Sequence, residues 1–342
     1  MTHEEPAKAR LLADAAGARN RAVALAGVGG KGLILRHFCH TPEGSHPSGS
    51  GVQALDMFMP RPLGRFLARL GALFTGLALT GCVAMINLTV PRAGYSIRPD
   101  VAYGSDPRQK MDLYVPDGLT APAPVILFFY GGSWQNGSKE LYRAFAQAFM
   151  SKGIVVAIAD YRLYPQVRYP AFVQDGAAAF RFLHDHAKAY GGDPGRVFLA
   201  GHSAGAYIAV MLDSDLHYLK DAGADPAWVR GVIGIAGPYD FLPLSDPALI
   251  DIFGGVSVAA TQPIAHVDGK RAPMLLAHGT ADDTVGIGNS RRLAAKLRSY
   301  GSVVELRAYP GVGHIGIILS LASGFRDRTT LREDIAAFVA SH

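Results

Sequence analysis

The stretch that decides the fold is Gly201-His202-Ser203-Ala204-Gly205, a G-x-S-x-G sequence between two apolar runs. Residues 196–200 are β-rich, and residues 206–212 can continue as a helix. Strand, sharp turn and helix in succession are the context in which G-x-S-x-G forms a nucleophile elbow. Glycines let the strand and the helix pass closely, and the helix N-terminus directs N–H groups toward negative charge beside Ser203. The flanking elements favour this interpretation over an ordinary Gly/Ser turn.

Strand-like and helix-like segments alternate through residues 98–342. The apolar runs 124–130 and 154–159 predict strands buried on both faces of a sheet. Two short alternating runs, around 97–103 and 110–115, predict an antiparallel pair at the sheet edge. The other expected elements are strands at 196–201, 229–236, 273–278 and 303–308, and helices at 141–151, 172–190, 289–300 and 329–340.

This alternation predicts one α/β domain with a doubly wound, mostly parallel central sheet and helices on both faces. The longer connections, 213–228 and 238–271, are the expected places for small cap segments.

The charge distribution separates the N-terminal segment from the body. Residues 1–92 hold ten Lys and Arg against five Asp and Glu, which accounts for the whole net charge of +5. The body is therefore neutral, and we expect no nucleic-acid partner.

Both cysteines, Cys39 and Cys82, precede the body, so a disulfide framework is not expected. Cys39 stands between His37 and His40, but no second cluster completes a metal site. Neither a metal nor an organic cofactor is predicted.

The N-terminal region predicts an export signal. Residues 1–58 resemble a disordered segment or a mis-called extension, with Met57 or Met59 as the true start. Residues 59–82 combine a basic start with an apolar run, and their end resembles a bacterial lipobox in which Cys82 would carry lipid. Residues 83–97 are expected to form a linker or lead-in to the body.

We therefore expect an exported protein, periplasmic or held at the membrane by lipid. An uncleaved membrane-spanning helix and a buried domain helix are the alternatives for the same run.

Two loops after late strands supply partners for Ser203. The loop after 273–278 carries Asp282, and the loop after 303–308 carries His314. Their order along the chain predicts Ser203 as nucleophile, His314 as general base and then acid, and Asp282 as the residue that orients the imidazole.

Other titratable residues near these loops are weaker candidates. Asp283 competes with Asp282 for the role of the acid. His202 and His278 are interpreted as structural neighbours rather than bases.

An oxyanion hole is expected where Tyr130-Gly131-Gly132-Ser133-Trp134 follows the first buried strand. The backbone N–H groups of Gly132 and Ser133, together with that of Ala204, are predicted to point at one oxygen atom. A simple Gly-Gly turn is the alternative.

Residues from about 98 to 341 resemble an α/β-hydrolase of the carboxylesterase/lipase type, close to the hormone-sensitive-lipase-like and the feruloyl and acetyl-xylan esterase-like groups. The family's oxyanion motif, H-G-G-x-W or H-G-G-G, has Tyr130 here in place of His. Its H-G-x-x-D-x-x-V pattern selects Asp282 over Asp283. The matching motifs are Gly131–Trp134, Asp160–Arg162, Gly201–Gly205 and Gly311–His314.

The resemblance implies a serine hydrolase that cleaves a small-molecule carboxylic ester through an acyl-enzyme. The small size of the cap segments favours a short acyl chain. The same group includes kynurenine formamidases, so amide cleavage is the nearest alternative. A prolyl-oligopeptidase-type peptidase is less expected, because no propeller-sized domain precedes the body. A catalytically inactive binding module is a further alternative, although both Ser203 and His314 are present.

Overall fold

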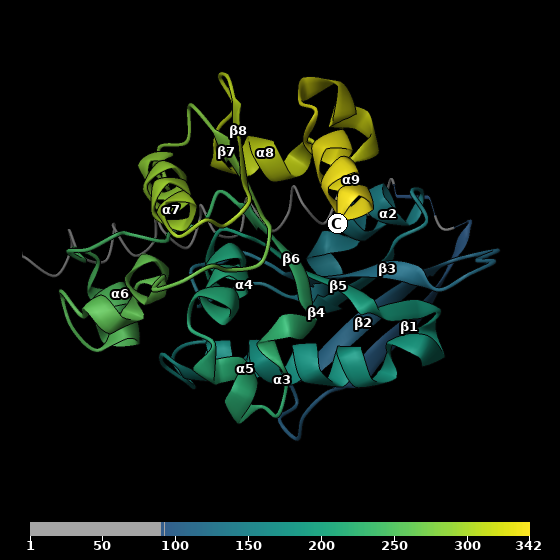
Figure 1. Ribbon diagram of the computed structural model, residues 1–342, viewed down its shortest axis with the longest axis horizontal. Coiled ribbons are helices and arrows are strands. Elements are labelled where there is room, and N and C mark those ends of the chain that lie inside the picture. Colours follow the sequence, from purple (N-terminus) through teal and green to yellow (C-terminus); the bar gives the residue numbers. More distant parts are fainter. Residues whose placement is uncertain (1–89, 92) are drawn as a thin grey trace, which may run out of the picture. The chain divides into compact units, whose positions relative to one another are not determined.

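One eight-stranded sheet organises residues 90–91 and 93–342, the part of the chain that the computed structural model describes (Figure 1). The strands are Tyr95–Ala102 (β1), Lys110–Pro116 (β2), Ala123–Phe129 (β3), Val155–Ala159 (β4), Gly192–His202 (β5), Val229–Ile235 (β6), Met274–Gly279 (β7) and Val304–Tyr309 (β8). They lie in the order β1-β2-β4-β3-β5-β6-β7-β8. β2 runs antiparallel to β1 and to β4, and all other neighbours are parallel. The predicted mostly parallel sheet and its antiparallel edge pair are confirmed.

Helices cover both faces of the sheet. They are Arg143–Met150 (α2), Ala171–His186 (α3), Ala204–Ser214 (α4), His217–Asp221 (α5), Pro247–Phe253 (α6), Gly288–Ser299 (α7), His314–Leu319 (α8) and Leu331–Ser341 (α9). In Figure 1, α3, α4 and α5 lie on one side of the sheet, and α2 and α9 lie on the other. The central strands are accordingly buried on both faces. Every residue of β4 is buried, as the continuous apolar run predicts.

Four parallel strands bring the candidate site residues to one edge of the sheet. β3 ends at Phe129, which pairs with Gly201 near the end of β5. β7 ends at Gly279, which pairs with Tyr309 at the end of β8. Because the carboxyl ends of parallel strands share an edge, the four loops that follow leave from the same side of the sheet.

Some element boundaries differ from the predictions. β1 begins at Tyr95, inside the predicted linker, because Tyr95 pairs with Pro116 of β2. The long helix predicted over 172–190 divides into α3 and a 3-10 turn, Ala187–Tyr190. Gly191 ends this turn in the left-handed conformation, at φ 75°.

The long connections contain short helices. The connection 213–228 holds α5, and the connection 238–271 holds α6. The second connection also contains two 3-10 turns, Ala259–Thr261 and Pro263–His266. These are the segments expected to form a small cap.

The predicted N-terminal features lie outside the described residues. They are the extension over 1–58, the signal segment over 59–82 with Cys82, and most of the linker. Within 90–91 and 93–342, no helix has both the length and the apolar composition needed to cross a membrane.

Candidate active site

Ser203 occupies the sharp turn between β5 and α4. Its backbone, at φ 54° and ψ −122°, lies in a region that serine adopts only when the surroundings enforce it. A Cβ atom on Gly201 would lie 2.2 Å from the carbonyl oxygen of Gly205, and a Cβ on Gly205 would lie 2.0 Å from that of Phe129. Both positions therefore require glycine. α4 begins directly after Ser203, so the positive end of the helix dipole lies beside its hydroxyl.

The imidazole of His314 lies next to the Ser203 hydroxyl. Nε2 of His314 is 2.9 Å from Oγ of Ser203. His314 follows β8 as the first residue of α8, and its side chain is buried. With the ring proton on Nδ1, Nε2 accepts a hydrogen bond from the hydroxyl. In this geometry the imidazole can remove the serine proton.

Asp282 completes the line of contacts behind His314. Its Oδ2 lies 2.8 Å from Nδ1 of His314, and its Oδ1 accepts the backbone N–H groups of Thr284 and Val285 at 3.0 and 2.8 Å. Burial raises the pKa of this carboxyl, but hydrogen bonds from His278, His314 and Val285 outweigh burial and hold the pKa well below its usual range. The ionised carboxylate therefore holds the ring proton on Nδ1 and can stabilise a charged imidazole.

Two other titratable residues lie in or beside the loop between β7 and α7, residues 280–287, which we call the acid loop. Asp283 is exposed, whereas Asp282 is buried and contacts the imidazole. His278 lies beneath the loop, with Nδ1 2.7 Å from Oγ of Ser290 and Nε2 2.7 Å from the carbonyl oxygen of Val285. The structure thus brings Asp282, rather than Asp283, to the candidate base.

His202 is a buried neighbour of the candidate base. Its Nε2 lies 3.1 Å from the carbonyl oxygen of His314, so the ring donates its proton there. Burial lowers the pKa of His202 to about 3, and the nearby His314 ring contributes to the shift as the second largest cause. The ring is therefore neutral, and it fixes the His314 loop against the elbow.

The loop after β3 lies against the elbow. A Cβ atom on Gly131 would lie 3.0 Å from Cβ of Ser203. Ser133 and Trp134 have φ values of 53° and 59°, and Gly132 has φ 138°. A positive φ is costly for Ser133 and Trp134, which both carry a Cβ atom, and such strain persists where the surrounding structure fixes it.

The predicted oxyanion donors have no acceptor in the described part of the chain. The backbone N–H groups of Gly132 and Ser133 form no hydrogen bond there, and neither does that of Ala204, the first residue of α4. Each is therefore available to an oxygen atom of a bound molecule.

Tyr130 stands where the resembling family has histidine, and its ring is fully buried between Tyr142 and Tyr161. Its hydroxyl accepts a hydrogen bond from Nη2 of Arg108 at 2.6 Å. The same nitrogen donates to the carbonyl oxygen of Gly137 at 3.0 Å, so Arg108 ties both ends of the loop. Burial raises the pKa of the Tyr130 phenol well above its usual range, so it stays neutral. Arg108 lies between β1 and β2 and was missed by the sequence analysis, since no motif marks it.

Aromatic side chains pack beside the elbow and form what we call the aromatic cluster. Tyr207 lies one helical turn after Ser203, to whose carbonyl oxygen it donates its N–H at 3.1 Å. The Trp134 ring meets the Tyr207 ring edge-on, with 5.1 Å between centroids. The cluster consists of Trp134, Phe172, Tyr207, Phe241 and Phe253.

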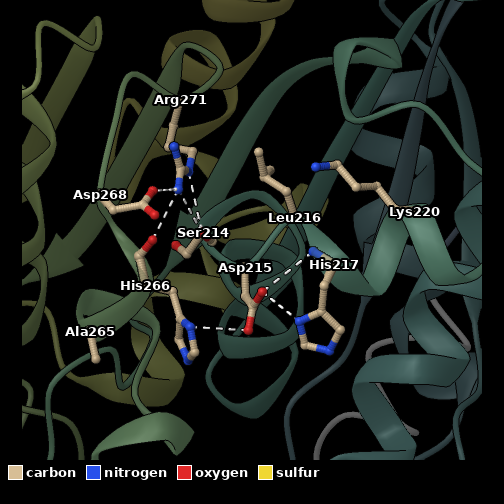
Figure 2. Close-up of a pocket in the computed structure, with 9 residues that line it drawn as sticks. All are labelled: Ser214, Asp215, Leu216, His217, Lys220, Ala265, His266, Asp268 and Arg271. Atoms are coloured by element: carbon tan, nitrogen blue, oxygen red, sulfur yellow. Dashed lines mark hydrogen bonds and ion pairs between the residues drawn. The ribbon is translucent and has the colours of Figure 1, made fainter.

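A pocket of about 340 Å³ opens at the other end of α4 (Figure 2). Asp215 lies between two imidazoles there, 2.5 Å from Nδ1 of His217 and 3.0 Å from Nδ1 of His266. Arg271 pairs with Asp268. Within residues 90–91 and 93–342, no cluster of three or more His, Cys, Asp or Glu side chains is placed to hold a metal ion. The lining residues are Ser214, Asp215, Leu216, His217, Lys220, Ala265, His266, Asp268 and Arg271.

Two family models match the chain. The BD-FAE model matches residues 111–297, more than half of the sequence, and includes β3, β5 and the loop that bears Asp282. The model of the prolyl oligopeptidase family matches residues 256–342, which include Asp282 and His314.

The relatives that the chain resembles in sequence are named as esterases. The chain is 30% identical over 247 residues to the probable isoprenylcysteine alpha-carbonyl methylesterase ICMEL1 of Arabidopsis thaliana, covering 65% of this chain and 52% of that protein. It is 31% identical over 242 residues to the esterase LipC of Mycobacterium tuberculosis, covering 64% and 60%. The chain thus spans between about half and two thirds of the length of these relatives.

Solved structures with the same fold are also esterases. Esterase B of Lactobacillus rhamnosis aligns with a TM-score of 0.68 and 20% identity, over 80% of this chain and 96% of that one. The propionate-bound esterase Est2 of Thermogutta terrifontis aligns with a TM-score of 0.60 and 25% identity, over 73% and 96%. The family match and the fold agree, so this protein belongs to the BD-FAE family and has the α/β-hydrolase fold of the carboxylesterase and lipase group.

Proposed function

We propose that this protein is a carboxylesterase in which Ser203 is the nucleophile, His314 the general base and Asp282 the acid that orients the imidazole. One observation carries the proposal. An unbroken line of contacts runs from Oγ of Ser203 to His314 at 2.9 Å and from His314 to Asp282 at 2.8 Å, at the N-terminus of α4. The names of the relatives support the same reaction class.

The reaction proceeds in two halves. In the first, Oγ of Ser203 bonds to the ester carbonyl carbon while its proton passes to Nε2 of His314. The bond to the leaving alcohol breaks, and His314 returns the proton to the alcohol oxygen. In the second half, water attacks the acyl-enzyme in the same way, which releases the carboxylic acid and restores the Ser203 hydroxyl.

Negative charge that develops on the carbonyl oxygen needs donors that are already in place. The N–H groups of Gly132, Ser133 and Ala204, which have no acceptor in the described part of the chain, suit this role. Loss of one such donor typically costs about 2.7–4 kcal/mol of transition-state stabilisation.

The aromatic cluster favours a short acyl chain. Trp134 comes from the loop after β3, residues 130–137, which we call the oxyanion loop because it holds two of the proposed donors. Tyr207 comes from the first turns of α4, so both side chains lie near Ser203. Both side chains are buried against Phe172 and Phe253. Since a packed core resists insertion of extra methylenes, long acyl chains should fit poorly here.

Hydrolysis of p-nitrophenyl acetate, butyrate and octanoate by the full chain tests the proposal. Ser203→Ala should abolish turnover, whereas Ser214→Ala, a serine at the other end of the same helix, should retain it. The acetate and butyrate esters should react faster than the octanoate. Equal turnover by Ser203→Ala and wild type would remove the assignment of the nucleophile.

The same assay separates the alternatives. A folded protein that cleaves no ester should next be given N-formylkynurenine, for the formamidase alternative. The methyl ester of a prenylated cysteine should be included because relatives are named for that substrate class. Failure on all of these, with unchanged folding, would favour a binding module.

We also propose that Cys82 carries a lipid that holds the exported protein at a membrane. This rests on the sequence of residues 59–82 alone. Mass spectrometry of the native protein from the membrane fraction should find a mature chain that begins at a lipidated Cys82. A mature chain that retains residues from 1–58 would contradict the proposal.

A further inference from the structure

His278 is a fully buried imidazole with an oxygen partner at each nitrogen. It lies near the end of β7 and has no exposed surface. Nδ1 is 2.7 Å from the hydroxyl of Ser290 on α7, and Nε2 is 2.7 Å from the carbonyl oxygen of Val285. Nε2 also lies 3.3 Å from Oδ2 of Asp282. The ring thus joins β7, the acid loop and α7.

The surroundings define where the ring proton must be. Nε2 faces a carbonyl oxygen and a carboxylate oxygen, and neither of these can donate a hydrogen bond. Nε2 therefore carries a proton and donates it. The hydroxyl of Ser290 can donate or accept, so it can satisfy Nδ1 of His278 and hold the ring in this orientation.

Each oxygen atom of Asp282 consequently has two polar neighbours. Oδ1 accepts the N–H groups of Thr284 and Val285, while Oδ2 lies between the imidazoles of His314 and His278. Without the His278 donor, Oδ2 would keep one partner, and the side chain could turn about its terminal bond. A turned carboxylate no longer presents Oδ2 squarely to Nδ1 of His314.

We infer that His278 is a positioning residue that acts through Asp282, holding the carboxylate and the end of its loop in the geometry that orients His314. The inference rests on the proposed function, in which Asp282 orients the general base. His278 does not contact Ser203, so its effect should fall on turnover rather than on substrate binding.

Two variants of equal polarity but different reach test the inference. The amide nitrogen of glutamine can occupy the place of Nε2, whereas that of asparagine reaches only to the place of Nδ1. His278→Gln should therefore keep kcat within about threefold of wild type. His278→Asn should lose about 10- to 100-fold in kcat with little change in KM, as expected when a hydrogen bond to a charged group is lost.

The control is another imidazole that is paired with a carboxylate. His217 lies 2.5 Å from Oδ1 of Asp215, at the far end of α4. His217→Asn should leave kcat unchanged. Equal losses in His278→Gln and His278→Asn, or unchanged kcat in both, would overturn the inference.

A spectroscopic readout separates this inference from the proposed function. The far-downfield proton resonance of the hydrogen bond between His314 and Asp282 should be present in wild type and in His278→Gln, and shifted or lost in His278→Asn. This signal does not depend on turnover, so it tests positioning even if no ester is cleaved. An identical resonance in all three proteins would contradict the inference, whereas absence of Ser203-dependent turnover would contradict only the proposed function.

Discussion

The two ends of α4 both hold buried polar groups, but they meet different surroundings. At the N-terminal end, Ser203, His314 and Asp282 form a continuous line of hydrogen-bonding contacts. At the C-terminal end, Asp213 is buried with Oδ1 3.4 Å from the N–H of Ala272. Oδ2 of Asp213 has no partner in the described part of the chain.

Electrostatics reinforce this difference. The N-terminus of a helix stabilises negative charge, whereas its C-terminus stabilises positive charge. Burial raises the pKa of Asp213 to about 7, while hydrogen bonds hold the pKa of Asp282 well below its usual range. Asp213 at the C-terminal end of α4 is thus pushed toward neutrality, whereas Asp282, on the loop that meets the N-terminal end, is held ionised.

The two ends of α4 differ in the features expected of a reactive site. The C-terminal end has the pocket of Figure 2 and a strongly shifted pKa, two features often found at functional sites. It lacks a nucleophile that is paired with a base. The N-terminal end has that pair, a favourable helix dipole and unpaired backbone donors. If the proposed function holds, complete donor–acceptor geometry is the feature that marks the reactive end of α4.

The largest expected effect separates the two neighbouring acids. Asp282→Asn should lower kcat by about 10³- to 10⁴-fold, because an amide cannot accept at both oxygen positions and favours the wrong tautomer of His314. Asp283→Asn, on an exposed neighbour, should stay within about twofold of wild type. Steady-state kinetics on p-nitrophenyl acetate measure both. Similar losses in the two variants would contradict the assignment.

A smaller effect is expected from pH. An imidazole that acts as a general base can take the serine proton only while it is itself unprotonated, so the rate should fall as the pH is lowered from 8 to 5. kcat/KM should decline at least about tenfold over this range. Asp282 stays ionised throughout, because its pKa lies well below the usual range. Circular dichroism should show that the protein stays folded, and a flat rate profile would argue against His314 as the base.

Removal of the Tyr130 hydroxyl tests the support of the oxyanion loop. Tyr130→Phe keeps the buried ring but loses the bond to Arg108, which also holds Gly137. kcat should fall about fivefold, equivalent to about 1 kcal/mol, with KM nearly unchanged. Tyr300→Phe, at an exposed position, is the control and should behave as wild type. A change in KM alone would place the effect on substrate binding instead.

A substitution of Asp213, at the C-terminal end of α4, should change stability and leave kcat within about twofold of wild type. The folded-state pKa of Asp213 is raised, so the ionised form disfavours folding. This penalty is absent when the pH lies below the unfolded-state pKa, and it grows as the pH rises. It reaches its full size when the pH exceeds the folded-state pKa of about 7. Asp213→Asn should therefore raise the free energy of unfolding by about 2–3 kcal/mol at pH 8. At pH 4 the variant and wild type should have nearly the same free energy of unfolding. Urea titrations at both pH values measure this, and a pH-independent difference would refute it.

The sequence allowed the sheet and the candidate triad to be predicted for the same reason. Parallel strands are marked by continuous apolar runs, and the loops after them converge at one edge of the sheet. Ser203, Asp282 and His314 each follow such a run. The structure places them in contact, although their chemical roles stay a prediction.

Other features of the molecule could not be predicted from the sequence. Arg108 reaches Tyr130 from a turn far away in the chain, and this contact depends on tertiary packing that no local pattern encodes. The unpaired carboxylate oxygen of Asp213 is equally invisible, because the residue ends an ordinary apolar helix. The 3-10 turn after α3 also escaped prediction, since tightening of a helix end leaves the apolar period unchanged.

Covalent labelling of the full chain with diethyl p-nitrophenyl phosphate tests whether Ser203 is the nucleophile. This phosphate ester reacts with a serine that a neighbouring base activates, and it leaves a stable diethyl phosphoryl group on Oγ. We expect one adduct per chain, found by peptide mass spectrometry on Ser203 and absent from Ser203→Ala. An adduct on a different serine, or no adduct on a folded protein that cleaves esters, would contradict the account.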